Sequence, residues 1–131
     1  MQKGKEKTRD IKFFSEKNQT MICVHTPEAR EYAKSLEEQS GIKNYETNRV
    51  LELEHFSHVN PVGIRPDYFK TVWVSDFFLR YSDGSMAVRE IVRPEMLQKR
   101  AVIERLELSR RYWAALDIKD WRIVLFREMN T

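Results

Sequence analysis

The sequence predicts a single α/β domain in which helices flank a mixed β-sheet. Three patterns lead to this fold class: a helix with start and stop signals at residues 27–39, two strand-like segments around Asp83-Gly84, and a long helical stripe at residues 95–116. A chain of 131 residues can bury one hydrophobic core but is short for two domains. The last strand is expected to join the sheet after a helical crossover.

The first helix is predicted from its boundaries. Thr26 can cap the first turn, Pro27 suits the first helical position, and Gly41 can end the helix. Partial alternation with β-branched residues then predicts a strand over residues 45–54. Residues 55–67, which contain two prolines and a glycine, predict a loop.

A β-hairpin is the next expected element. Residues 68–81 and 86–92 are rich in aromatic and β-branched side chains and flank the turn at Asp83-Gly84. Residues 95–116 lack internal proline and glycine and predict an amphipathic helix, and residues 121–126 predict the final strand.

The type of turn decides which side chains face each other. A three-residue loop with Gly84 in the left-handed conformation places Asp76 opposite Glu90, whereas a two-residue loop pairs Asp76 with Ile91. Facing side chains stand about 5 Å apart at Cβ, where two ionised carboxylates repel unless a cation lies between them. Mg²⁺ binds one or two carboxylates together with water and phosphate oxygens. The alternative is that Asp76 and Glu90 pair with nearby arginines.

Composition places the chain among globular proteins. Apolar residues make up 41% and charged residues 33%, and the apolar runs are too short for a membrane span. The N-terminus lacks the apolar segment of a secretory signal, so we expect a cytoplasmic protein without a membrane partner. The single cysteine, Cys23, is expected to be a small buried apolar residue.

The net charge of +3 is concentrated in the first 20 residues, which we interpret as a basic N-terminal arm. The rest of the chain, residues 21–131, is expected to form the folded domain. An arm of this kind can bind a phosphate backbone by releasing counterions, or can be a solvated terminus. The candidate DNA-binding residues are Lys3, Lys5, Lys7, Arg9 and Lys12 of the arm, with Lys99 and Arg110 of the last helix.

Several local stretches resemble the TnsA endonucleases of heteromeric transposases. They are Ser15-Glu-Lys-Asn, Ile42-Lys-Asn-Tyr-Glu, Asp76 with Asp83-Gly84, Glu90-Ile-Val and Glu104-Arg-Leu-Glu-Leu-Ser-Arg-Arg-Tyr-Trp, the last being the most specific. The resemblance covers residues 14–126 and implies a restriction-endonuclease-like fold. It implies an Mg²⁺- or Mn²⁺-dependent endonuclease subunit that nicks double-stranded DNA at transposon ends. The implied partners are a transposase subunit and an ATPase regulator.

The same resemblance assigns the site residues. It implies that Glu28, Asp76 and Glu90 form the catalytic acidic set, with Asp76 and Glu90 binding the metal; Glu31 is the alternative to Glu28. The family carries a lysine where this chain has Val92.

This departure keeps two other functions open: a nuclease-fold DNA-binding or assembly subunit that has lost catalysis, and a stand-alone nuclease of a phage or mobile element. Arg93 or Lys99 is the expected substitute for the missing lysine.

Other residues favour structural roles. His55 and His58 have metal-like spacing but no cysteine or further histidine nearby to complete a site, and the three tryptophans are expected in the core. The arginines of the last helix predict either a solvated face balanced by glutamates or phosphate contacts.

Overall fold

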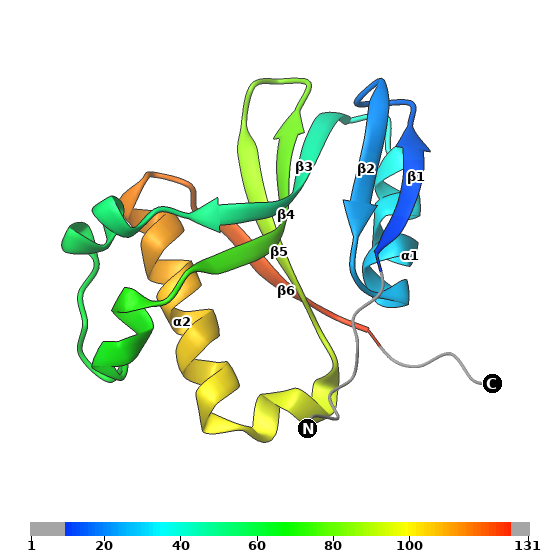
Figure 1. The fold of residues 1–131 in the computed structure, drawn as a ribbon. Helices are drawn as coiled ribbons and strands as arrows, with labels where there is room; N and C mark the ends of the chain where they lie inside the picture. The colour runs from blue at the N-terminus through cyan, green and yellow to red at the C-terminus, as the bar shows by residue number, and fades with distance from the viewer. Residues whose placement is uncertain (1–9, 127–131) are drawn as a thin grey trace.

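We describe residues 10–126 from a computed structural model (Figure 1). In chain order the strands and helices are β1 (Ile11–Ser15), β2 (Thr20–Val24), α1 (Pro27–Glu37), β3 (Ile42–Leu51), β4 (Trp73–Tyr81), β5 (Met86–Val92), α2 (Arg100–Ala115) and β6 (Asp120–Leu125). Short 3-10 helices occupy Leu53–His58 (η1), Pro66–Lys70 (η2) and Pro94–Gln98 (η3). The predicted mixed α/β class is confirmed.

The central sheet has the strand order β3-β4-β5-β6. Its first three strands are antiparallel, and β6 returns through α2 to pair in parallel with β5, as expected from the crossover. The two faces of the sheet are covered by different elements. The helix α2 lies on one side, while α1 and the β1-β2 hairpin lie on the other (Figure 1).

Each face of the sheet buries its own core. On β4, Phe78 packs toward α2 with Trp113, whereas Phe77 and Leu79 pack toward α1 with Leu36. This alternation is the two-residue period of a strand that is buried on both sides. The tryptophans belong to the α2 core as expected: Trp113 is buried, and Trp73 and Trp121 pack against the cluster.

Part of the expected N-terminal arm belongs to the folded domain, because residues 11–15 form β1 and pair with β2. Glu37 of α1 anchors this hairpin: its carboxylate accepts hydrogen bonds from Ser15 Oγ at 2.6 Å and Tyr45 Oη at 2.5 Å. Ser15 is buried, so residues 11–15 are not a solvated segment. Lys3, Lys5, Lys7 and Arg9 lie outside the described residues.

Several boundaries differ from the sequence expectation. The strand β3 ends at Leu51, where the backbone N–H of Glu52 donates to Tyr112 Oη of α2 at 3.0 Å and the chain enters η1. Tyr68 lies in η2 rather than in β4. The predicted helix over residues 95–116 is interrupted, because η3 ends at Gln98 and α2 begins only at Arg100.

Among residues 10–126, no helix is both long enough and apolar enough to cross a lipid bilayer.

Candidate functional site

The turn between β4 and β5 is the three-residue loop that the acidic pair requires. Gly84 has φ of +93°, the left-handed region that favours glycine. Tyr81 N–H donates to the carbonyl of Ser85 at 2.9 Å, so these two residues close the loop. The predicted hairpin register is confirmed.

This register brings the two acids close to each other, just beyond the end of the paired ladder. The ladder runs from Arg80↔Met86 to Phe77↔Arg89, and Asp76 and Glu90 occupy the next position on their strands. Asp76 and Glu90 therefore come from adjacent antiparallel strands at the end of the hairpin away from the turn.

The regular alternation of side chains between the two faces of β4 is interrupted at Asp76. Ser75 faces α2 whereas Phe77, two residues later, faces α1, although a regular strand would place both on one face. Opposite this point on β3, Asn48 has φ of +55°, an uncommon conformation for a residue other than glycine. The Asp76 carboxylate turns across to β5, where its Oδ2 accepts the backbone N–H of Ile91 at 2.7 Å.

Glu90 faces α2 and is held by a buried network. Its Oε2 accepts hydrogen bonds from Ser75 Oγ at 2.5 Å and Ser109 Oγ at 2.6 Å. The indole N–H of Trp113 donates to Ser75, and that of Trp121 donates to Ser109. Four side chains from β4, α2 and β6 thus fix one carboxylate oxygen.

The environment raises the pKa of both acids. Burial, followed by the negative charge of Asp76, raises the pKa of Glu90 to about 7. Burial also raises the pKa of Asp76, opposed by the Ile91 N–H and by the positive charges of Arg105 and His25. Arg105 opposes the shift of Glu90 as well. The pair thus consists of one buried and one partly buried acid, with the cationic side chain of Arg105 close enough to act on both.

Each acid retains one oxygen that can bind a cation. Among the described residues, neither Asp76 Oδ1 nor Glu90 Oε1 receives a hydrogen bond, since the observed bonds go to Oδ2 and Oε2. Asp76 is partly exposed, whereas Glu90 is only 1% exposed, so a cation would reach the pair from the side of Asp76. Two carboxylate oxygens without a hydrogen bond fit the preference of Mg²⁺ or Mn²⁺ for hard oxygen ligands.

Glu28 is engaged elsewhere. Its carboxylate forms an ion pair with the guanidinium of Arg93, whose Nε lies 2.6 Å from Glu28 Oε2. Within residues 10–126, Glu28 does not form a three-ligand group with Asp76 and Glu90 whose donor atoms lie within 4.8 Å of one another. Glu31, the alternative, lies beside Lys34 on the exposed side of α1.

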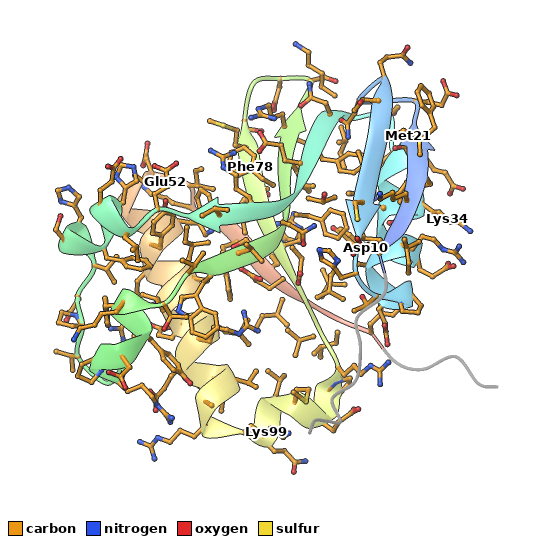
Figure 2. The ribbon with its side chains drawn as sticks, in the orientation of Figure 1. Asp10, Met21, Lys34, Glu52, Phe78 and Lys99 are labelled. Carbon is orange, nitrogen blue, oxygen red and sulfur yellow. The ribbon has the colours of Figure 1, made fainter. Side chains whose placement is uncertain are left out.

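The expected substitutes for the missing lysine differ in their surroundings. Val92 is only 5% exposed, so its position is an apolar part of the core. Arg93 is bound to Glu28, and Lys99 lies at the turn into α2 (Figure 2). Arg105, which sequence reasoning did not select, precedes Ser109 by one helical turn and therefore shares a face with the serine that binds Glu90.

Sequence reasoning also missed the two serines. A signal for Ser109 was present, because it is a polar residue within the apolar stripe of α2, and buried polar groups require partners. Ser75 carried no comparable signal, because alternation places it on the face away from Glu90. His25 was missed because it lies outside every motif considered.

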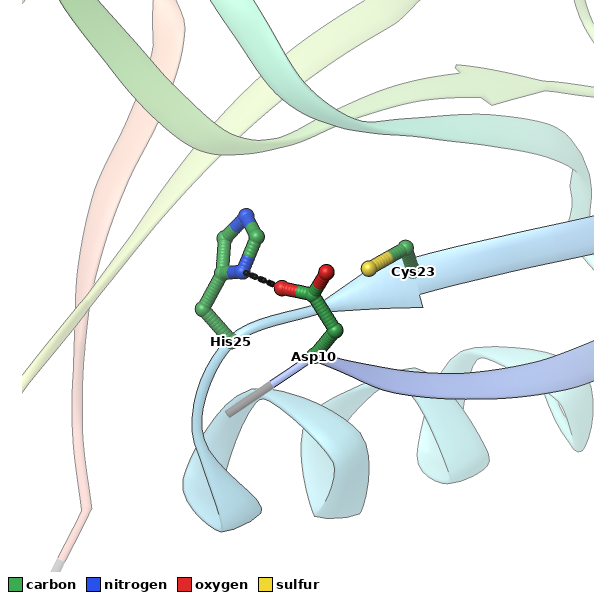
Figure 3. Close-up of side chains that lie close together, drawn as sticks. All are labelled: Asp10, Cys23 and His25. Atoms are coloured by element: carbon green, nitrogen blue, oxygen red, sulfur yellow. Dashed lines mark hydrogen bonds and ion pairs between the residues drawn. The ribbon is translucent and has the colours of Figure 1, made fainter. Parts of the chain in front are cut away.

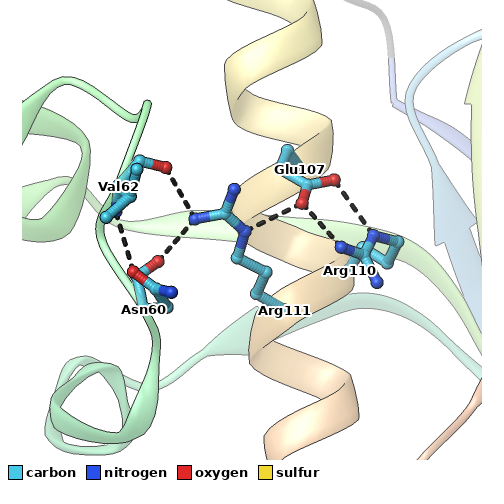
Figure 4. Close-up of polar contacts among 5 residues, drawn as sticks. All are labelled: Asn60, Val62, Glu107, Arg110 and Arg111. Carbon is cyan, nitrogen blue, oxygen red and sulfur yellow. Dashed lines mark hydrogen bonds and ion pairs between the residues drawn. The ribbon is translucent and has the colours of Figure 1, made fainter.

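The basic side chains of α2 mostly serve the fold. Arg110 and Arg111 both bind Glu107, and Arg111 Nη1 also donates to the carbonyls of Asn60 and Val62 (Figure 4). These contacts tie the η1–η2 segment to α2 and agree with the interpretation of a charge-balanced face. Lys12, the candidate DNA-binding residue on β1, is exposed.

Cys23 is not the buried apolar residue that was expected. It is partly exposed at the surface of β2, where its side chain lies near Asp10 and His25 (Figure 3).

No family model matches the chain, and no curated protein matches it. The site described above therefore rests on its own geometry.

Proposed function

We propose that this chain is a metal-dependent DNA endonuclease subunit of a heteromeric transposase, with a restriction-endonuclease-like domain of the TnsA kind. The supporting topology is a three-stranded antiparallel unit, a crossover helix and a parallel fourth strand. A hairpin of that sheet carries the acids. Duplex DNA is the proposed substrate, and a transposase and an ATPase regulator are the proposed partners.

The observation that carries the proposal is the proximity of Asp76 and Glu90, which lie on adjacent strands and whose charges interact. Two carboxylates share a mostly buried position, and burial together with their mutual repulsion raises the pKa of Glu90 to about 7. An arrangement of this kind disfavours the doubly charged state unless a cation is bound. Perturbed acids of this sort are more frequent at functional sites than elsewhere.

The residues of the site have separable roles. Ser75 and Ser109 fix Oε2 of Glu90, which leaves Oε1 as its metal ligand. The Ile91 N–H fixes Oδ2 of Asp76 and leaves Oδ1. A bound Mg²⁺ would lower the pKa of a water molecule and neutralise charge at the attacked phosphate.

Arg105 is proposed to supply the positive charge that a lysine at position 92 would provide. It acts electrostatically on both acids and comes from α2, on the face that carries Ser109. A fixed cation beside a phosphate stabilises the charge that develops in the transition state.

A second candidate is a nuclease-fold subunit that binds DNA or assembles the complex without cutting. Two observations favour it: Val92 is buried in place of the lysine, and Glu28 is neutralised by Arg93. In this case the network around Glu90 stabilises the sheet against α2 and has no catalytic role.

Nicking of supercoiled plasmid by the full-length protein, in the presence of Mg²⁺ or Mn²⁺, tests the proposal. Asp76→Asn and Glu90→Gln should each abolish nicking, while the exposed matched control Asp67→Asn should nick as the parent does. Equal nicking by all four proteins would contradict the assignment. Binding of DNA by the parent protein without metal-dependent nicking would favour the second candidate.

A further inference from the structure

A cluster of potential metal ligands lies on the β1-β2 hairpin, separate from the acidic pair. Asp10, Cys23 and His25 each place one donor atom within 4.8 Å of the other two (Figure 3). His25 Nδ1 lies 3.2 Å from Asp10 Oδ1. The three residues are exposed or partly exposed, so a metal ion can reach them from solvent.

The register of the hairpin explains this convergence. Ile11 and Val24 form the last pair of the hairpin, and Asp10 and His25 directly flank this pair, where their side chains are in contact. Cys23 lies two residues before His25 and therefore on the same face. The opposite face carries Ile11 and Val24, which pack into the α1 core. The three ligands are thus brought together by strand pairing and not by chance proximity of flexible loops.

The backbone that carries the cluster is held in place from both sides. The carbonyl of Cys23 accepts hydrogen bonds from Thr47 Oγ1 at 2.9 Å and Asn48 Nδ2 at 3.2 Å, both on β3. Directly after His25, Thr26 caps α1 by accepting the N–H of Ala29. Anchoring of this kind reduces the conformational freedom that the ligands lose when a metal binds.

We propose that Asp10, Cys23 and His25 form a binding site for a borderline divalent transition metal, with Zn²⁺ as the preferred ion. Thiolate, imidazole and carboxylate are the donors of zinc sites, and metal–ligand bonds of about 2.0 to 2.3 Å place neighbouring donors roughly 3 to 4 Å apart. The three donor atoms lie within 4.8 Å of one another, so side-chain rotation can bring them toward this geometry. Three protein ligands leave a fourth position for water or another ligand.

The hard carboxylate ligands of the proposed nuclease site favour a different metal ion. Asp76 and Glu90 offer oxygen alone, which suits Mg²⁺ or Mn²⁺, whereas the thiol of Cys23 favours a softer ion. The zinc site does not depend on the nuclease proposal, because none of its ligands belongs to the acidic pair.

Cobalt titration of the reduced, metal-free, full-length protein tests the site. One equivalent of Co²⁺ should produce a thiolate-to-cobalt charge-transfer band and the strong visible bands of a tetrahedral ion, and Zn²⁺ should displace both. Cys23→Ser should remove the charge-transfer band. His25→Gln and Asp10→Asn, at exposed positions that tolerate substitution, should each weaken Zn²⁺ competition at least tenfold.

Two variants serve as matched controls. His55→Gln removes a histidine from the other mixed group, which contains Glu52 and Glu54, and should leave the cobalt spectrum unchanged. Asp76→Asn should also leave it unchanged even if nicking is lost, which separates the two proposals. Absence of the charge-transfer band in the parent protein, or its persistence in Cys23→Ser, would overturn the zinc site.

Discussion

Ser109 of α2 donates a hydrogen bond of 2.6 Å to Glu90 of β5, and this contact joins the buried acid to the helix that covers the sheet. Glu90 is only 1% exposed, so its protonation state affects both folding and metal binding.

Stability should decrease with rising pH because of Glu90. Its pKa is raised from 4.5 to about 7 in the folded protein, so the folded chain retains a proton that the unfolded chain releases. The free energy of unfolding should fall between these two pH values by an amount on the order of 3 kcal/mol. Urea unfolding across this range measures the slope. Glu90→Gln should reduce this pH dependence of stability, and the exposed control Glu95→Gln should not. If the pH dependence persists in Glu90→Gln, another group causes it.

Metal binding at the acidic pair should strengthen as pH rises through about 7, because the cation must replace the proton on Glu90. Calorimetric titration with Mn²⁺ on both sides of this pH measures the change and the released protons. Asp76→Asn should remove the binding. Affinity that is independent of pH would show that Glu90 is not a ligand.

The ion pair between Arg65 and Glu104 should contribute stability that is lost in acid. The side-chain hydrogen bond from Arg65 Nε, at 2.9 Å, is the main cause that lowers the pKa of Glu104 to about 2. This contribution is present above the ordinary pKa of 4.5 and disappears as pH falls toward 2. Glu104→Gln should therefore be less stable than the parent near neutral pH, with the difference narrowing in acid. A constant difference across the acid range would contradict this origin.

Substitution of Gly84 should show that the turn requires a residue that readily adopts the left-handed conformation. Added Cβ atoms at Gly84 and Gly41 meet nothing within 4 Å, but only Gly84 has a left-handed φ, of +93°. Gly84→Ala should therefore reduce the free energy of unfolding by about 1 kcal/mol, whereas Gly41→Ala should be neutral or stabilising. Chemical denaturation of the two variants provides a matched comparison. Equal changes in the free energy of unfolding of the two variants would show that the left-handed conformation of Gly84 is not the cause.

Arg105 should matter for nicking more than Lys99. If Arg105 provides the positive charge beside the acids, Arg105→Ala should reduce the nicking rate by about a hundredfold or more. Arg105→Lys should retain part of the rate because it keeps the charge. Lys99→Ala should nick as the parent does. If Lys99→Ala loses nicking and Arg105→Ala does not, the positive charge is supplied by Lys99 instead of Arg105.

The fold class can be predicted from local sequence patterns. The caps of α1, the strand-like composition around Asp83-Gly84 and the apolar stripe of α2 identified the order of the main elements and the hairpin that carries Asp76 and Glu90. These features depend on residues close together in sequence, where propensity and periodicity act directly. The β1-β2 hairpin was missed because its strands are short and lie within a run of charged residues.

By itself, the sequence determined the α/β class and limited the hairpin to two registers, of which the structure shows the three-residue loop. Only the tertiary structure decided what surrounds the two acids of this hairpin: Ser109 and Arg105 come from α2, and the orientation of Ser75 depends on a break in strand alternation opposite Asn48. Likewise, Glu28 is bound by Arg93, a residue 65 positions away. Burial, charge interactions and hydrogen bonds act through space, so the pKa and ligand capacity of a side chain depend on neighbours that sequence separation does not reveal.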